Sequence, residues 1–519
     1  MTRPQFTIRA FILAVVVLLV LYCNSGVYRP LRAPNGTRSQ PVAFPNSQTT
    51  PLGSYAIAAG ELPGYTGWGR PEFTLAGYFT AATPKGDTIS AGDPYIIELQ
   101  CRGHADCQTP SYFYVRAYGP AILTGRIEAR GKGGYRALLY PVDPGVYTVE
   151  IVITISNPPP FDVFPLASKA APILYEGYLL QDFPTTLTVL PNKMDHFTKL
   201  PVCNAADLLN DRSIYPHERA RWKVVDQIRS KHHQSNTGDG TQVTFPAYQQ
   251  SYNSLGVVAD YQFHNCRLLV IPYRGENVTF NPFLCLQEPT HFILIGDSTM
   301  RIQHQIFQQY LSLPEMKHHS LTFIELYGGI LRCNTYGPIL EQELKVELER
   351  NSKSQAHRAV LFNTGLHDIH RLCGTEWEKD RRTYLTDPQL PCVEQYRRGL
   401  ADLIHVVGTL PAAVKLFQTT TAGWPKYGNF GINWDPRYGQ GLPLDASFVE
   451  YFNTIATTLL ESHPYIGVVD GYWISLARPD NREIGPRAAI GPKLSHPGIE
   501  VVHAMVRIWS MVVLRNLCG

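Results

Sequence analysis

The sequence predicts a three-layer α/β domain with a parallel five-stranded sheet, preceded by a β-sandwich and an N-terminal transmembrane helix. Three observations lead to this prediction. From residue 291 onward, apolar strand segments alternate with helical segments, as in parallel sheets covered on both faces. Short β-type runs separated by turn residues fill residues 72–190. An uncharged apolar run occupies residues 10–23.

The N-terminal segment is expected to direct the chain into the secretory pathway. Arg3 and Arg9 precede the apolar run Ala10–Cys23, and no Ala-x-Ala cleavage site follows it. We therefore expect residues 1–26 to form the signal anchor of a single-pass type II membrane protein. The alternative is a signal peptide cleaved after Ser25 or Gly26, which would release a secreted protein. Residues 27–71 are rich in Pro, Gly, Ser and Thr, which indicates a flexible stalk.

Charge and composition limit the classes of partner. The formal net charge is only +3, and no basic run with interleaved aromatic residues stands out, so a nucleic-acid partner is not expected. Apolar residues make up 44% of the chain, enough to bury a sizeable core. Asn35 and Asn277 each begin an Asn-x-Thr triplet and are predicted glycosylation sites, which agrees with a luminal chain.

The cysteines also suit an oxidising compartment. The chain has ten, of which Cys23 lies in the apolar N-terminal run. Closeness in sequence suggests two disulfides, Cys101 with Cys107 and Cys373 with Cys392. The remaining connectivity cannot be deduced from sequence.

Residues 72–190 predict the β-sandwich. Its candidate strands are EFTLAGYFTA, DPYIIELQC, SYFYVRAYG, YRALLYPV and VYTVEIVITI. Tyr147 follows Asp143-Pro-Gly-Val, which is the position of a tyrosine corner, where a tyrosine hydroxyl bonds back to the backbone; an ordinary turn is the alternative. Residues 191–284 show no clear pattern and are treated as a connecting region.

Residues 285–519 predict the α/β domain. The expected strands are Phe292–Ile295, Leu321–Leu326, Ala359–Phe362, Val414–Thr419 and Ile466–Asp470. The expected helices are Thr299–Leu313, Pro338–Arg350, Glu394–Leu410, Ala446–Glu461 and Gly498–Asn516.

Polar residues gather where these strands end, which is where open α/β sheets place their sites. Ser298, Asn363 and Asp470 follow or end three of the strands, Gly329 follows a fourth, and His496 precedes the last helix. Each has a simpler interpretation: Ser298 as a helix cap, His496 as a loop residue, Asp470 as an acceptor for backbone amides, and the glycine as a turn former. Their joint position at one rim favours a site.

These residue types suit acyl transfer by a serine nucleophile. A serine hydroxyl needs a nearby imidazole to take its proton, and a carboxylate can hold that imidazole in the right tautomer. The oxyanion needs donors already in place, which the Ser298 amide, a glycine amide and Asn363 can supply. The Gly-x-Ser-x-Gly elbow of α/β-hydrolases is absent, because Met300 fills its last position.

The segments GDSTMR, NTGLHD and SHPG…LRNLCG resemble GDSL/SGNH-type PC-esterase domains. That group includes plant trichome-birefringence-like polysaccharide O-acetyltransferases and the sialic acid O-acetyltransferase of the animal Golgi. An anchor, an immunoglobulin- or filamin-like β domain and then this domain most resemble the neurexophilin-and-PC-esterase (NXPE) family. The resemblance covers residues 72–519 and is most specific around Ser298.

The resemblance implies roles for individual residues. Ser298 would be the nucleophile and His496 the base, while Gly329 and Asn363 would form the oxyanion hole. PC-esterases typically have an aspartate three residues before the histidine, but Lys493 stands there. Asp470 is therefore our candidate for the orienting acid. Glu500 and His503 have the acid-x-x-His spacing and are the alternative pair, without the His-Pro context.

The predicted function is glycan O-acyl transfer, most simply O-acetyl transfer, or ester hydrolysis, in the Golgi or another endomembrane compartment. No cofactor is expected to stay bound; acetyl-CoA or a similar acyl donor would be a substrate, brought into the lumen by a donor-transporting membrane partner. The alternative is an inactive SGNH-like binding protein, which Lys493 favours. A metal hydrolase built on His367 and His370 is the weakest interpretation, and no metal site is expected.

Overall fold

The computed structural model describes fifteen stretches of the chain. They are residues 75–83, 86–156, 174–192, 200–210, 218–227, 251–253, 257–269, 282–326, 342, 344–346, 349, 357–369, 390–423, 446–484 and 492–518. Within these stretches no helix is long and apolar enough to cross a membrane. The predicted anchor at residues 1–26, the stalk at 27–71, and the glycosylation sites Asn35 and Asn277 lie outside them.

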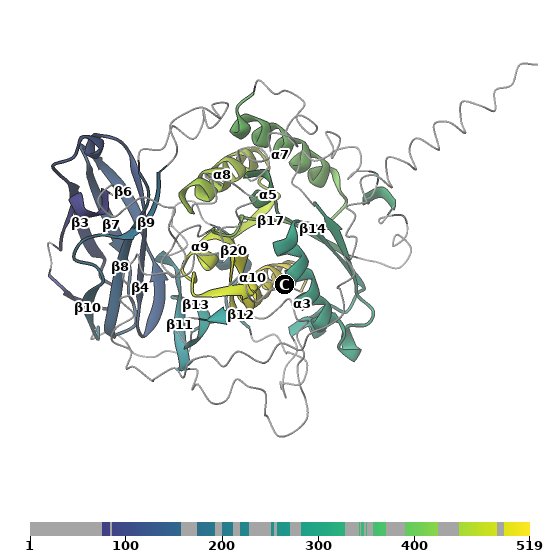
Figure 1. Cartoon of the computed structure of the whole chain (residues 1–519). Coiled ribbons are helices and arrows are strands. Elements are labelled where there is room, and N and C mark those ends of the chain that lie inside the picture. Colours follow the sequence, from purple (N-terminus) through teal and green to yellow (C-terminus); the bar gives the residue numbers. More distant parts are fainter. Residues whose placement is uncertain are drawn as a thin grey trace, which may run out of the picture. The chain divides into compact units, whose positions relative to one another are not determined.

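The predicted β-sandwich is present as two layers that share one core, and their strands pair antiparallel except for one parallel pair at a sheet edge (Figure 1). The first sheet runs β1 (Phe79–Ala82), β3 (Tyr95–Cys101), β7 (Gly134–Leu139) and β6 (Arg126–Gly131). The second includes β5 (Ala121–Thr124), β4 (Ser111–Tyr118), β8 (Gly145–Ser156), β10 (Thr185–Leu190) and β2 (Thr88–Ser90), with β9 (Leu174–Leu179) beside β8. Alternate residues of β3 are buried, as expected for strands with one face on a core.

Two details of the sandwich can be compared with the sequence. The Tyr147 hydroxyl donates to the Asp143 carbonyl at 2.9 Å, so the predicted tyrosine corner is confirmed. The first predicted strand is shorter than expected, because Leu75–Tyr78 form a 3₁₀ turn before β1 begins at Phe79.

The connecting region, residues 191–284, contains strands that join the sandwich sheet. Its strand β11 (Ala220–Gln227) pairs with β5 of the sandwich, and β13 (Val257–Phe263) pairs with β11. The second sandwich sheet therefore continues into the connecting region. Sequence alone did not reveal this pairing, because β11 joins a strand about a hundred residues earlier, and periodicity reports only local structure.

The α/β domain contains the predicted five-stranded parallel sheet. Its strand order is β15 (Ser320–Glu325), β14 (Thr290–Gly296), β16 (His357–Phe362), β17 (Val414–Gln418) and β18 (Gly467–Val469). Four predicted helices are present as α3 (Ser298–Leu311), α7 (Cys392–Thr409), α8 (Ala446–Leu459) and α10 (Ile499–Leu517). Most of the fifth, Pro338–Arg350, lies outside the described residues. Two short helices, α5 (Leu366–Asp368) and α9 (Tyr472–Leu476), follow strand ends.

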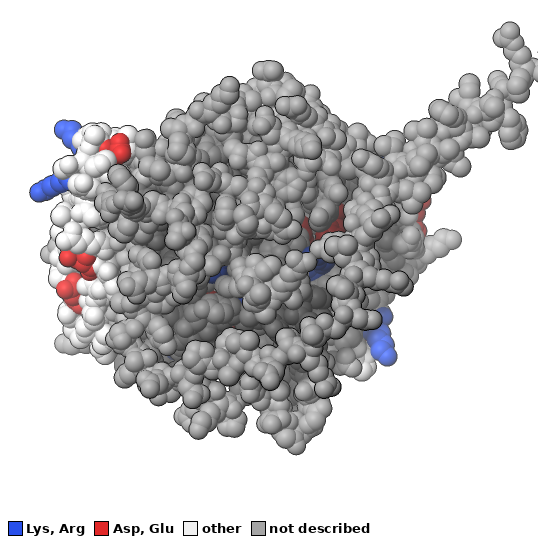
Figure 2. Space-filling model, viewed as in Figure 1, with Lys and Arg blue, Asp and Glu red and all other residues white. Residues whose placement is uncertain are grey.

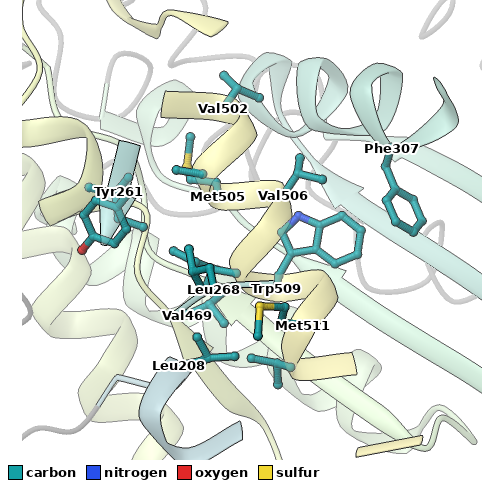
Figure 3. Close-up of a cluster of buried hydrophobic side chains, with 14 of the residues drawn as sticks. Leu208, Tyr261, Leu268, Phe307, Val469, Val502, Met505, Val506, Trp509 and Met511 are labelled. Carbon is teal, nitrogen blue, oxygen red and sulfur yellow. The ribbon is translucent and has the colours of Figure 1, made fainter. Parts of the chain in front are cut away.

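The helices cover both faces of this sheet, which gives three layers (Figure 1). Successive residues of β14 point to opposite faces: Ile293 and Ile295 join the core under α7 and α8, whereas Phe292 and Leu294 join the core under α3 and α10. Figure 3 shows the second of these cores, in which Trp509 of α10 packs against Phe307 of α3 with ring centroids 4.6 Å apart.

Disulfides link distant parts of the chain. The predicted Cys101–Cys107 bond is present, together with Cys203–Cys266 and Cys285–Cys518. Cys392 is disulfide-bonded, but Cys373 lies outside the described residues, so that pairing stays a prediction. The Cys285–Cys518 bond ties the C-terminal end of α10 to the segment just before β14.

The described part of the surface seen in Figure 2 carries charges of both signs. The blue and red side chains visible at its edges stand singly or in small groups among white residues. This distribution agrees with the small net charge of +3.

Candidate active site

Ser298 lies where the buried strand β14 turns into helix α3. All seven residues of β14 are buried, as expected for a central parallel strand. The helix cap is Asp297, not Ser298: one Asp297 carboxylate oxygen accepts from the Thr299 amide at 2.8 Å and from the Thr299 hydroxyl at 2.7 Å. The interpretation of Ser298 as a cap is therefore wrong, and its hydroxyl is available for another contact.

Gly296 allows this turn to lie close to the neighbouring strand. A Cβ at this position would lie 2.7 Å from the Met300 Cβ and 3.2 Å from the Asn363 carbonyl oxygen. The Asn363 amide donates to the Ile295 carbonyl at 2.9 Å. Asn363 thus lies beside the end of β14, at the point between β14 and β16 where the strand order reverses, which is where ligands bind in open α/β sheets.

His496 contacts Ser298 directly. The Ser298 Oγ and the His496 Nε2 lie 2.7 Å apart, although 198 residues separate them in sequence. His496 belongs to β20 (Pro492–Pro497), which leads into α10. The structure therefore brings together the two residues that the sequence placed at one rim.

The acid beside His496 is Glu483, a residue that sequence reasoning missed. The His496 Nδ1 lies 2.6 Å from a Glu483 carboxylate oxygen, and Glu483 is 4% exposed. Glu483 lies on β19 (Asn481–Ile484), which pairs antiparallel with β20. The acid and the base thus come from two neighbouring strands of one hairpin. The only sequence signal is a charged strand segment, NREI, shortly before SHPG.

Asp470, the predicted orienting acid, has a different role. Its carboxylate accepts from the Trp473 amide at 3.0 Å and the Ile474 amide at 3.2 Å, and so caps helix α9. The Thr419 hydroxyl donates to it at 3.3 Å. Burial raises the Asp470 pKa to about 6, against the opposing effect of these three donors. The assignment of Asp470 as the partner of His496 was wrong; it follows the simpler interpretation, in which it bonds backbone amides.

Asn363 and the Ser298 backbone amide are the two predicted oxyanion donors that lie within the described residues. Asn363 is fully buried; its Nδ2 makes only a long 3.5 Å contact with the Gln418 carbonyl, and its Oδ1 has no partner within the described part of the chain. The Ser298 amide lies in the first turn of α3, where helix amides lack an intrahelical acceptor. Gly329, the other predicted donor, and the Lys493 side chain lie outside the description.

The alternative pair, Glu500 and His503, is not assembled at Ser298. The His503 Nδ1 lies 3.0 Å from the Tyr310 hydroxyl, and Glu500 forms an ion pair with Arg478 at 2.8 Å. Burial lowers the His503 pKa to about 4, with a further contribution from Arg507. His503 is therefore a neutral packing residue at pH 7.

We expect His503 to make the fold sensitive to acid. Its pKa is about 4 in the fold and about 6.5 in an unfolded chain, so the unfolded state binds more protons between these values. The part of the free energy of unfolding that comes from keeping His503 neutral is therefore fully present above pH 6.5 and is lost as the pH falls toward 4. Glutamine does not titrate in this pH range. Between pH 7 and pH 5 the free energy of unfolding of His503→Gln should therefore fall by about 1–2 kcal/mol less than that of wild type. Urea melts at both pH values test this, and equal losses would contradict it.

Gly498 sets the spacing between the hairpin and helix α10. Its amide donates to the Asn481 carbonyl at 2.8 Å, and a Cβ there would lie 2.1 Å from the Asn481 Oδ1. We expect Gly498→Ala to cost about 1–3 kcal/mol through overpacking. The Cβ would also lie 2.9 Å from the Arg482 backbone nitrogen, so the β19 backbone must shift. Ser298 should therefore react at least about tenfold more slowly with a fluorophosphonate. Gly77→Ala is the matched control, since a Cβ there meets nothing within 4 Å; equal behaviour of the two variants would refute the prediction.

The described residues contain no group of three or more His, Cys, Asp and Glu side chains placed to hold a metal ion. In the segment proposed for a metal site, the Thr364 hydroxyl donates to the buried Asp368 carboxylate. His370, its second histidine, lies outside the described residues.

No family model and no curated protein matches the chain. Among solved structures, the chain is similar to the Lin-41 filamin domain, with 15% identity and a TM-score of 0.15; the match covers 22% of this chain and 94% of that chain. It is also similar to a Bacteroides vulgatus protein described as a glycoside hydrolase, with 7% identity and a TM-score of 0.16 over 64% of this chain and 60% of that one. At these TM-scores neither similarity bears on function.

Proposed function

We propose that the chain is a serine acyltransferase or esterase that acts on O-acyl, most simply O-acetyl, groups of glycans. The observation that carries this proposal is the continuous contact from Ser298 through His496 to Glu483, with distances of 2.7 Å and 2.6 Å. A hydroxyl, an imidazole and a carboxylate in this order match the chemical requirements of an acyl-serine mechanism.

The proposed reaction has two halves. In the first, the His496 Nε2 takes the Ser298 proton as Oγ attacks the acyl carbonyl carbon, and the resulting oxyanion accepts from the Ser298 amide and Asn363. His496 then gives this proton to the departing oxygen or sulfur, which leaves an acyl-serine. In the second half, His496 takes a proton from water or a sugar hydroxyl, which attacks the acyl-serine, and returns it to Ser298 Oγ. Glu483 accepts from the His496 Nδ1 and so holds the ring in the tautomer whose Nε2 can take the serine proton.

Glu483 also bears on the resemblance to PC-esterases. The resemblance leaves Lys493 at the position of the expected aspartate, but an acid from the neighbouring strand now contacts His496. We therefore retain the proposal of an SGNH-type PC-esterase domain of the NXPE family, with an immunoglobulin- or filamin-like β-sandwich. The disulfides support an oxidising compartment. A Golgi location, membrane anchoring, acetyl-CoA as donor and a donor-transporting partner are parts of this proposal.

The first test is covalent labelling of the intact luminal protein by a fluorophosphonate, followed by peptide mapping. The proposal predicts that Ser298 carries the label. Ser312→Ala, at the far end of the same helix, is the control and should label like wild type. No label on Ser298 in a folded protein would favour the inactive binding protein that Lys493 first suggested.

The second test separates transfer from hydrolysis. The protein is incubated with isotopically labelled acetyl-CoA, with and without an unacetylated sialylated glycan, and then with an O-acetylated glycan alone. Label on the glycan indicates transferase activity, whereas release of acetate from the acetylated glycan indicates esterase activity. A protein that fluorophosphonate labels but that shows neither reaction would reject the O-acetyl group as its substrate.

A further inference from the structure

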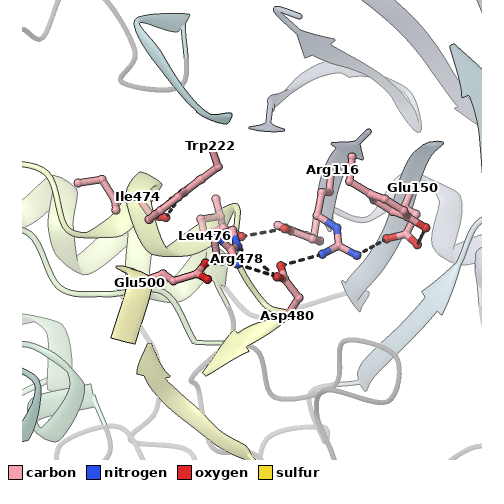
Figure 4. Close-up of polar contacts among 10 residues, drawn as sticks. Arg116, Glu150, Trp222, Ile474, Leu476, Arg478, Asp480 and Glu500 are labelled. Atoms are coloured by element: carbon pink, nitrogen blue, oxygen red, sulfur yellow. Dashed lines mark hydrogen bonds and ion pairs between the residues drawn. The ribbon is translucent and has the colours of Figure 1, made fainter. Parts of the chain in front are cut away.

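A chain of five buried or half-buried charges runs from strands β4 and β8 of the β-sandwich to the first turn of helix α10 (Figure 4). Its order is Glu150, Arg116, Asp480, Arg478 and Glu500. Arg116 contacts Glu150 at 2.9 Å and Asp480 at 3.4 Å. Arg478 contacts Asp480 at 3.1 Å and Glu500 at 2.8 Å. Each arginine therefore lies between two carboxylates.

These charges hold one another in fixed relative positions because they have little access to water. Arg116 is 2% exposed, and Asp480 and Arg478 are fully buried. A buried charge that loses its partner costs several kcal/mol, so each arginine strongly disfavours any movement of the acids beside it. Burial opposes the charge on Arg478, but Asp480 and Glu500 outweigh that effect and raise its pKa.

The chain of charges ends on the two segments that carry the acid and the base. Asp480 directly precedes β19, three residues before Glu483. Glu500 lies in the first turn of α10, four residues after His496. Arg116 belongs to β4 of the sandwich, so the sandwich contacts Asp480, the residue directly before the strand that carries Glu483.

Two neutral hydrogen bonds hold the segment just before Asp480 against the sandwich sheet. The Tyr114 hydroxyl of β4 donates to the Leu476 carbonyl at 2.7 Å. The Trp222 Nε1 of β11 donates to the Ile474 carbonyl at 2.9 Å, and the Arg478 guanidinium lies over the same indole at 4.9 Å. Both carbonyls come from α9, which leads through Arg478 and Asp480 into β19.

We propose that Arg116 of the β-sandwich is a positioning residue for the candidate active site. By holding Asp480 it fixes β19, and β19 aims Glu483 at His496. The sandwich would then help to position the catalytic residues rather than act as an independent binding domain. This inference rests on the proposed function for its kinetic readout.

The test compares two identical substitutions within the sandwich of the full-length chain. Arg116→Lys keeps the charge but cannot span both carboxylates as a guanidinium does. Arg136→Lys is the matched control, since Arg136 pairs with Glu98 at 2.6 Å on the half-exposed face of the other sheet. We expect Arg116→Lys to lower the rate constant for fluorophosphonate labelling at least about tenfold, and Arg136→Lys to leave it unchanged.

A double-mutant cycle separates positioning from general loosening of the fold. If Arg116 acts through Glu483, then Arg116→Lys should change labelling by less than about threefold in a Glu483→Gln background, because the orientation is already lost. A purely structural role would lower the rate by the same factor in both backgrounds, and that result would overturn the proposal. Asp480→Asn, which breaks the chain at its next link, is the second variant should Arg116→Lys not fold.

A spectroscopic readout keeps the inference separate from the proposed function. In Ser298→Ala protein, which cannot form an acyl-enzyme, the proton between His496 Nδ1 and Glu483 should give a far-downfield NMR signal. We expect this signal to weaken or disappear with Arg116→Lys and to persist with Arg136→Lys. If it survives both changes, the inference fails even if Ser298 is a nucleophile. If it depends on Arg116 while wild-type Ser298 takes no label, the inference stands and the proposed function fails.

Discussion

Ser298→Ala is expected to abolish fluorophosphonate labelling and acyl-enzyme formation while leaving the melting temperature nearly unchanged. The loss should be complete, because the proposed nucleophile is the Ser298 hydroxyl, which lies 2.7 Å from the His496 Nε2. The fold should persist, because Asp297 caps α3 and the Ser298 side chain satisfies no helix amide. Labelling with peptide mapping and a thermal melt measure the two effects on one protein sample.

Asp297→Ala provides the opposite pattern and serves as the control. It removes the acceptor of the Thr299 amide and should cost about 0.5–2 kcal/mol. Ser298 should still take the label in the molecules that stay folded. A Ser298→Ala protein that turns over normally would show that the contact with His496 has no catalytic use.

The sequence predicts those site residues that lie at the ends of strands or helices with a clear local pattern. Strands of a parallel sheet are buried on both faces, so all five appear in the sequence as short apolar runs. Ser298 and His496 could be predicted because each lies next to a strand or helix end that the pattern marks. Strand ends at one edge of a parallel sheet necessarily lie near one another.

Glu483 could not be predicted in the same way, because it reaches the site through strand pairing. Thirteen residues separate it from His496, and only the antiparallel pairing of β19 with β20 brings the two together. The pattern favours Asp470 because it ends a strand of the main sheet, yet the turn into α9 directs its carboxylate to helix amides instead. The contact of Arg116 with Asp480 is more remote still, at 364 residues.

Glu483→Gln should lower the labelling rate by up to about 10⁴-fold. The glutamine side chain has nearly the shape of glutamate but can present its NH₂ group to the His496 Nδ1. The ring would then carry its proton on Nε2, where it cannot accept the Ser298 proton. Since Gln also leaves the hairpin backbone intact, the melting temperature should change far less than the rate. Stopped reactions with a fluorophosphonate, analysed as rate constants, measure the effect.

Asp470→Asn is the matched comparison, because both variants exchange a buried carboxylate for an amide. It should change labelling by less than about threefold, since Asp470 contacts Thr419 and the α9 amides rather than His496. Its effect should be on stability. The Asp470 pKa is about 6 in the fold, which is above its unfolded value. The free energy of unfolding that this pKa difference contributes is therefore fully present below pH 4 and is lost as the pH rises through 6. The variant should therefore gain stability relative to wild type between pH 4 and 7. If Asp470→Asn abolished labelling and Glu483→Gln did not, the acid would be Asp470 and the hairpin assignment would be wrong.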